Sequence, residues 1–94
     1  MTTVTLRIPA ALREFADGLP ELDLQAASVG AVLELLSQRF PLLGQRIVDH
    51  NGAIRTYVNL FVGETNIRDA GGLATALADG DVITIIPAVA GGRS

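Results

Sequence analysis

The sequence has 94 residues, of which 49% are hydrophobic and 18% charged, values typical of one globular domain and not of a disordered chain. Its net charge of −3 and acidic pI near 4.8 argue against a nucleic-acid-binding protein, which needs a basic surface. The absence of cysteine excludes disulfides, thiolate metal sites and a cysteine nucleophile.

The N-terminal half predicts two strands followed by the main helix. Apolar and polar residues alternate over residues 3–8 and again over 21–25, as in two half-buried antiparallel strands. Apolar residues of 29–40 recur at helical spacing, with Ser28 as the expected N-cap and Pro41 as the residue that ends the helix. Short turns of helix are expected over residues 10–16 and 42–48.

The C-terminal half predicts the remaining strands. Residues 57–62 form the best strand of the chain, and its even-numbered residues are expected to face the helix. A brief strand is expected over 66–68, a short turn of helix over 73–77, and the last strand over 82–86, which is rich in β-branched residues.

This order of elements predicts an α+β fold of the β-grasp (ubiquitin-like) type, a mixed sheet with one main helix across one face. The first and last strands are expected side by side and parallel at its centre, because a crossover connection separates them. Residues 1–90 would form the β-grasp domain, and residues 91–94 a flexible tail. The sheet face away from the helix would stay open and carry Thr5, Arg7, Asn59, Phe61, Thr84 and Ile86.

The candidate chemistry lies in the pair Gly91-Gly92 near the C-terminus. Two glycines make a slender tip that can enter a narrow active site, and the reactive group of such a tip is its terminal carboxylate. ATP can activate this carboxylate as an acyl-adenylate, and sulfide or a persulfide can then displace AMP to leave a thiocarboxylate. The alternative is that the two glycines are only a frayed end of the chain.

Four segments carry a resemblance to the MoaD/ThiS/CysO sulfur carriers, and within that family to its CysO-type members. The first segment is residues 11–18, which contain Leu-Arg-Glu, and the second is residues 57–63. The third is residues 66–81, which end in Asp-Gly-Asp, and the fourth is residues 82–92, which end in Pro-Ala-Val-Ala-Gly-Gly. The resemblance covers nearly the whole domain.

The resemblance implies a protein-bound sulfur donor and not an enzyme. An E1-like activating enzyme of the MoeB/ThiF type would use ATP to adenylate and thiolate Gly92, and the carrier itself would bind no cofactor. A sulfurtransferase or a PLP-dependent synthase would then take the sulfur for the biosynthesis of cysteine or of another sulfur-containing metabolite. Two alternatives are a MoaD-like small subunit of molybdopterin synthase and a ubiquitin-like protein modifier.

Arg93-Ser94 depart from the family pattern, in which the mature chain ends at the second glycine. With these residues attached, Gly92 has no free carboxylate to activate, so the chain as written is expected to be an inactive precursor. Either a peptidase, such as a metallopeptidase, removes a native extension, or the two residues derive from cloning.

Phe61 and Ile86 are predicted to form an apolar docking patch for the activating enzyme, with Arg7 at its rim. The alternatives are that a loop or the tail covers the two apolar residues, and that Arg7 is only a solvated strand residue. No metal site is expected, because Asp79 and Asp81 fit a tight turn and His50 fits a solvated loop. The sequence shows no secretion signal and no apolar stretch long enough to span a membrane, so we expect a cytoplasmic protein.

Overall fold

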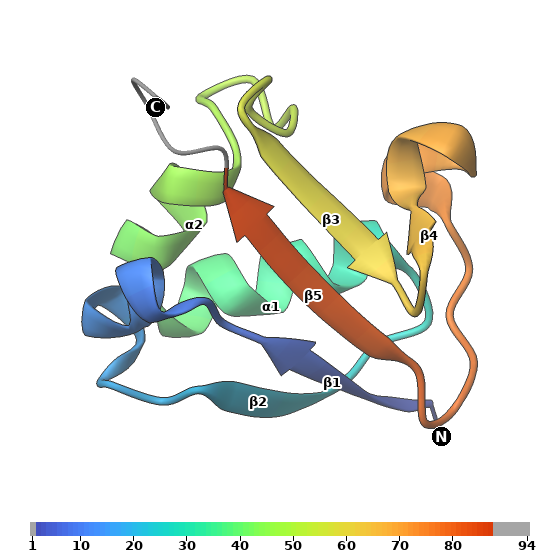
Figure 1. Ribbon diagram of the computed structural model, residues 1–94, viewed down its shortest axis with the longest axis horizontal. Helices are drawn as coiled ribbons and strands as arrows, with labels where there is room; N and C mark the ends of the chain where they lie inside the picture. The colour runs from blue at the N-terminus through green and yellow to red at the C-terminus, as the bar shows by residue number, and fades with distance from the viewer. Residues whose placement is uncertain (1, 88–94) are drawn as a thin grey trace.

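The computed structural model describes residues 2–87, which form a five-stranded mixed sheet and the helices packed against it (Figure 1). In chain order the elements are β1 (Thr3–Arg7), the 3-10 helix η1 (Ala10–Ala16), β2 (Glu21–Gln25), α1 (Val29–Arg39), α2 (Pro41–Ile47), β3 (Val58–Val62), β4 (Thr65–Asn66), the 3-10 helices η2 (Ile67–Asp69) and η3 (Gly72–Ala74), and β5 (Val82–Pro87).

The sheet has the strand order β2-β1-β5-β3-β4. The first and last strands are parallel neighbours, with residues 5–7 of β1 opposite residues 82–84 of β5, and the other pairs of strands are antiparallel. This topology confirms the predicted β-grasp fold. The expected boundary between domain and tail, at residue 90, lies outside the described residues.

The core lies between α1 and one face of the sheet. Alternate strand residues point into it, and Val4, Leu6 and Leu60 are each at most 1% exposed. The apolar stripe of α1 meets them, with Val32 and Leu36 fully buried. Figure 1 shows α1 crossing behind the sheet, which leaves the other face free of helices.

Ser28 caps α1 as the sequence predicts. Its Oγ accepts a hydrogen bond from the backbone N–H of Ala31 at 3.2 Å, which satisfies one of the free N–H groups in the first turn.

Replacing Ser28 with alanine is expected to lower the free energy of unfolding by about 1 kcal/mol, because the Ala31 N–H loses its acceptor. Urea denaturation measures this change. Ser28→Asp keeps a capping oxygen and serves as the matched control, and equal stability of the alanine and aspartate variants would contradict a capping role.

The structure shifts one predicted boundary by a residue and corrects one predicted strand. Pro41 ends α1 but is also the first residue of α2, where its missing N–H costs nothing because first-turn N–H groups have no partner in the helix. Ile67 and Arg68 belong to η2 and not to the brief strand, which consists of Thr65 and Asn66. Asn66 turns the chain here, since its side chain accepts a hydrogen bond from the Arg68 N–H at 3.0 Å.

Candidate functional site

The open face of the sheet brings together the three residues of the predicted docking patch. Arg7 lies opposite Thr84 across the β1–β5 pair, and Thr84 lies opposite Phe61 across the β5–β3 pair. Ile86 follows two residues after Thr84 on β5, so its side chain is on the same face. Arg7, Thr84 and Phe61 therefore form one row across three strands, and Ile86 lies beside this row.

Both apolar residues of the patch are accessible. Ile86 is 47% exposed, which is high for a β-branched residue in a strand at the middle of a sheet. Phe61 is half-buried and does not belong to the residues packed against the core, whereas its neighbour Val62 does. Within residues 2–87, neither a helix nor a loop covers these two residues, and their role in docking remains a prediction.

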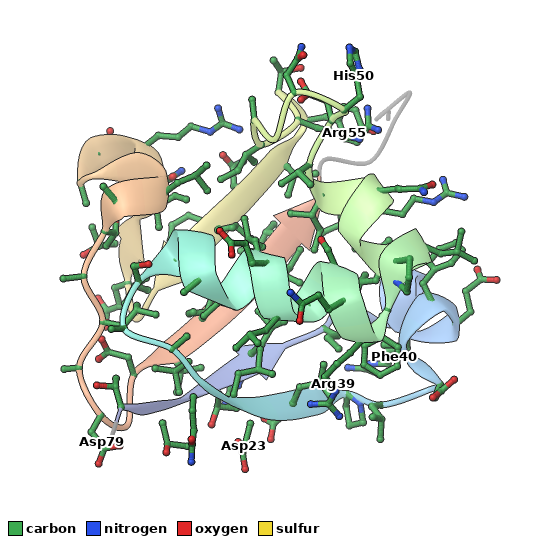
Figure 2. All side chains as sticks on the ribbon, turned by 180° about the vertical axis from the view of Figure 1, so that it is seen from behind. Asp23, Arg39, Phe40, His50, Arg55 and Asp79 are labelled. Atoms are coloured by element: carbon green, nitrogen blue, oxygen red, sulfur yellow. The ribbon has the colours of Figure 1, made fainter. Side chains whose placement is uncertain are left out.

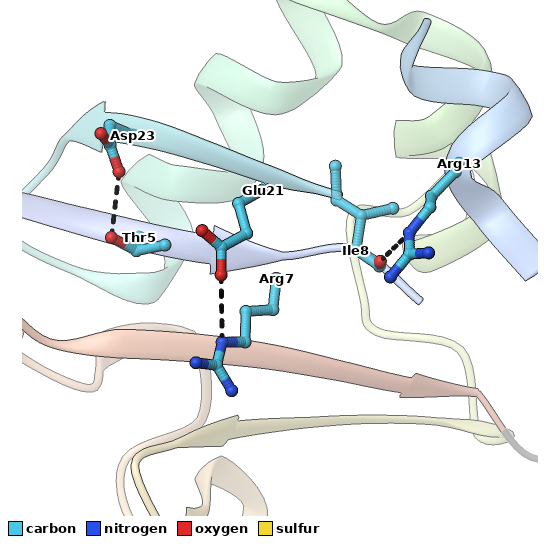
Figure 3. Close-up of polar contacts among 6 residues, drawn as sticks. All are labelled: Thr5, Arg7, Ile8, Arg13, Glu21 and Asp23. Atoms are coloured by element: carbon cyan, nitrogen blue, oxygen red, sulfur yellow. Dashed lines mark hydrogen bonds and ion pairs between the residues drawn. The ribbon is translucent and has the colours of Figure 1, made fainter. Parts of the chain in front are cut away.

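Arg7 lies at the edge of this face and forms an ion pair (Figure 3). Its Nε is 3.3 Å from Oε2 of Glu21 on β2, and both side chains are more than half exposed. Exposed pairs of this kind contribute little to stability, so the Arg7 guanidinium can exchange Glu21 for an acid on a partner at little cost. Thr5 and Asp23 form a second polar contact between the same two strands, with the Thr5 hydroxyl donating at 3.0 Å.

Arg68 supports β3, one of the strands of the patch, through contacts that the sequence did not reveal. Its Nη2 donates to the carbonyl oxygens of Val58, at 2.6 Å, and Arg55, at 3.0 Å, and its Nε donates to Oδ1 of Asn59 at 3.3 Å. Val58 pairs with Pro87 at the end of β5. Arg68 therefore stabilises the part of β3 that pairs with the end of β5. The only local signal was a polar Asn59 within an otherwise apolar strand.

Gly91 and Gly92 lie outside the described residues, but the strand that precedes them in the chain is described. The described chain ends at Pro87, the last residue of β5, which pairs with β1 on one side and β3 on the other. The tail therefore starts from a strand inside the sheet and not from an edge strand.

Residues 2–87 contain no cluster of three or more side chains suited to binding a metal ion. Asp79 and Asp81 serve the turn before β5, since Asp79 accepts the Thr3 N–H at 2.9 Å and Asp81 accepts the Ala78 N–H at 2.8 Å. His50 lies in the exposed loop after α2, as predicted. No helix in the described part of the chain has the length and apolar character needed to cross a bilayer.

Residues 6–92 match the family model of ThiS. The chain belongs to the ThiS family. The match ends at the second glycine of the tail and leaves out Arg93-Ser94. This ThiS-family chain is 40% identical to the sulfur carrier protein CysO of Mycobacterium tuberculosis over 91 residues, which cover 95% of this chain and 98% of CysO.

Two further relatives indicate the range of the similarity. A chain of the Amycolatopsis orientalis BexX/CysO complex superposes with a TM-score of 0.87 and 32% identity, covering 95% of this chain and 99% of that one. The molybdopterin synthase sulfur carrier subunit of Mycobacterium tuberculosis is 34% identical over 95 residues, with 98% of this chain and all of the relative covered. The resemblance to MoaD/ThiS/CysO carriers that the sequence motifs indicate is confirmed.

Proposed function

We propose that this protein is a sulfur carrier that is adenylated and then thiocarboxylated at Gly92, and that donates the sulfur to the biosynthesis of cysteine or of another sulfur-containing metabolite. The observation that carries the proposal is the family match through residue 92, ending at the glycine pair. The 40% identity with CysO, over nearly the full length of both chains, supports the same assignment.

The proposed chemistry needs only an acyl group from this chain. The Gly92 carboxylate attacks the α-phosphorus of ATP, so that an acyl-adenylate forms and pyrophosphate leaves. Hydrosulfide then attacks the carbonyl carbon, a C–S bond forms, and the C–O bond to AMP breaks. An E1-like enzyme of the MoeB/ThiF type would hold ATP and perform both steps, so the carrier would bind no cofactor and catalyse nothing itself.

The open face would hold the carrier on this enzyme while the tail enters its active site. Phe61 and Ile86 offer an apolar surface, and Arg7 a rim charge with an exchangeable partner. The BexX/CysO complex supports the expectation that a carrier of this shape docks on another protein. A sulfurtransferase or a PLP-dependent synthase would then take the sulfur, and a metallopeptidase would remove Arg93-Ser94 beforehand.

Intact-mass spectrometry tests the proposal. The chain ending at Gly92, incubated with a MoeB/ThiF-type enzyme from the same genome, ATP and sulfide, is expected to gain the mass difference between sulfur and oxygen. The 94-residue chain is the matched control, and its mass should stay unchanged because Gly92 is then an internal amide. An unchanged mass for the shorter chain would count against the carrier function.

A second candidate is the small subunit of molybdopterin synthase, which the 34% identity with that carrier subunit favours. A stable complex with a MoaE-like large subunit, seen by size-exclusion chromatography, would support this assignment. Sulfur transfer to an activated serine on a cysteine-synthase homologue would support the first.

A further inference from the structure

A groove of about 380 Å³ opens at the end of the molecule where β5 ends. Helix α2 supplies one wall, η1 another, and the segment before β3 the third. The lining residues are Phe15, Leu42, Gln45, Arg46, Arg55 and Tyr57. Leu42 is 61% exposed and Tyr57 50% exposed, so the groove has accessible apolar edges in addition to its two cations.

The fold holds both arginines of this groove in place. The guanidinium carbon of Arg46 lies 4.6 Å from the centre of the Phe15 ring, the geometry of a cation–π contact. The Nε of Arg55 donates to the backbone carbonyl of Gln45 at 2.8 Å. Each arginine therefore loses little conformational entropy when its remaining N–H groups bind a ligand.

Neither arginine is neutralised within residues 2–87, where Arg7–Glu21 is the one ion pair. The charge of Arg55 acts on Asp49, but the Asp49 carboxylate is held by hydrogen bonds within its own loop. It accepts the backbone N–H groups of Asn51 at 2.8 Å and Ala53 at 3.1 Å, and these hydrogen bonds lower its pKa more than Arg55 does. The groove is thus a positive site on a chain whose net charge is −3.

The groove also lies at the base of the tail. Tyr57 immediately precedes Val58, which pairs with Pro87, the last described residue. The five residues from 88 to 92 span at most about 18 Å when extended. An enzyme that binds Gly92 in its active site must therefore bring the rim of that site against this end of the carrier.

From these observations we infer that the groove binds carboxylate side chains on the activating enzyme, at the rim of the site that receives the tail. The inference rests on the proposed function and adds a second contact, separate from the patch on the open face. Arginine binds carboxylates through paired hydrogen bonds, and arginine and tyrosine are enriched at the centres of protein interfaces. Leu42 would supply apolar contact beside the charges.

Charge reversal at Arg46 tests the inference in the thiocarboxylation assay with the chain ending at Gly92. Arg46→Glu is expected to raise KM for the carrier about tenfold and to change kcat less than about twofold, because binding is weakened while the tail chemistry is untouched. Arg55→Glu should act in the same direction. Added salt should raise KM for the unmodified carrier more than for Arg46→Glu.

Arg39→Glu is the matched control. Arg39 is also an arginine beside an aromatic ring, 5.6 Å from Phe40, and its reversal changes the net charge equally. It does not line the groove, and it lies in the lower half of the view in Figure 2, whereas Arg55 lies at the top. Thermal melting of all the variants shows whether each is folded.

Three results separate the possibilities. If the unmodified chain ending at Gly92 is not thiocarboxylated, the proposed function itself fails. If it is, but Arg46→Glu and Arg39→Glu have the same KM, the groove does not contact the enzyme and the inference is overturned. Amide shifts of residues 45–57 that change when residues 88–94 are deleted from the free protein would make the tail the occupant, and would also overturn it.

Discussion

Replacing Phe61 with alanine is expected to lower kcat/KM for thiocarboxylation of the tail roughly thirtyfold, equivalent to about 2 kcal/mol of lost binding energy. Phe61 is the largest apolar side chain of the open-face patch and lies opposite Thr84 on the strand that leads to the tail. Truncating it removes apolar area that only a docked partner would bury. The loss should appear mainly in KM.

The stability of Phe61→Ala should change little, by about 1 kcal/mol or less, since Phe61 is not packed against the core. Ile86→Ala, on the neighbouring position of the same face, should repeat the kinetic effect. Leu19→Ala is the matched control, because Leu19 is an exposed leucine, 38% accessible, in the loop before β2. A KM for Phe61→Ala equal to that of Leu19→Ala would show that the enzyme docks elsewhere.

Gly44→Ala is expected to lower the free energy of unfolding by about 2 kcal/mol, although alanine is the better helix former by about 1 kcal/mol. Gly44 is a buried residue of α2 that faces Ser37 of α1. A Cβ at position 44 would lie 3.0 Å from Ser37 Cβ and 3.1 Å from Ser37 Cα, and it would contact Ser37 Oγ as well. The hydroxyl can rotate away, but the backbone of α1 cannot.

Thermal melting should show this change as a fall in Tm of about 10 °C. The double variant Ser37→Gly/Gly44→Ala removes two of the three contacts, so it should be more stable than the sum of the two single changes predicts. Purely additive effects, or a rise in Tm for Gly44→Ala, would mean that the two helices separate freely and that their close contact is unimportant.

The sequence predicted burial best for helices and strands whose apolar residues recur at a regular spacing. Alternation placed Val4 and Leu6 in the core and Phe61 and Ile86 on the open face, because a strand turns successive side chains to opposite sides. The stripe of α1 was equally readable from its helical spacing, and so was the Ser28 cap. These features depend on neighbours within one element.

Features that depend on contacts between distant segments could not be predicted from the sequence. Arg68 satisfies carbonyl groups at residues 55 and 58, more than nine positions away, and its own segment is too short to show a period. The groove near the end of β5 combines Phe15, Arg46 and Arg55 from three segments that only tertiary packing brings together. The same holds for Gly44, whose role appears only when α1 lies against α2.

The pairing of β1 with β5 has a consequence for biosynthesis. These two neighbouring strands lie far apart in the sequence, with Thr5 opposite Val82, so the ribosome must make residue 82 before they can pair. Contacts between such distant residues form slowly. Until then, a nascent chain exposes the apolar sides of its earlier strands. Chaperones are therefore expected to protect this chain most during that interval.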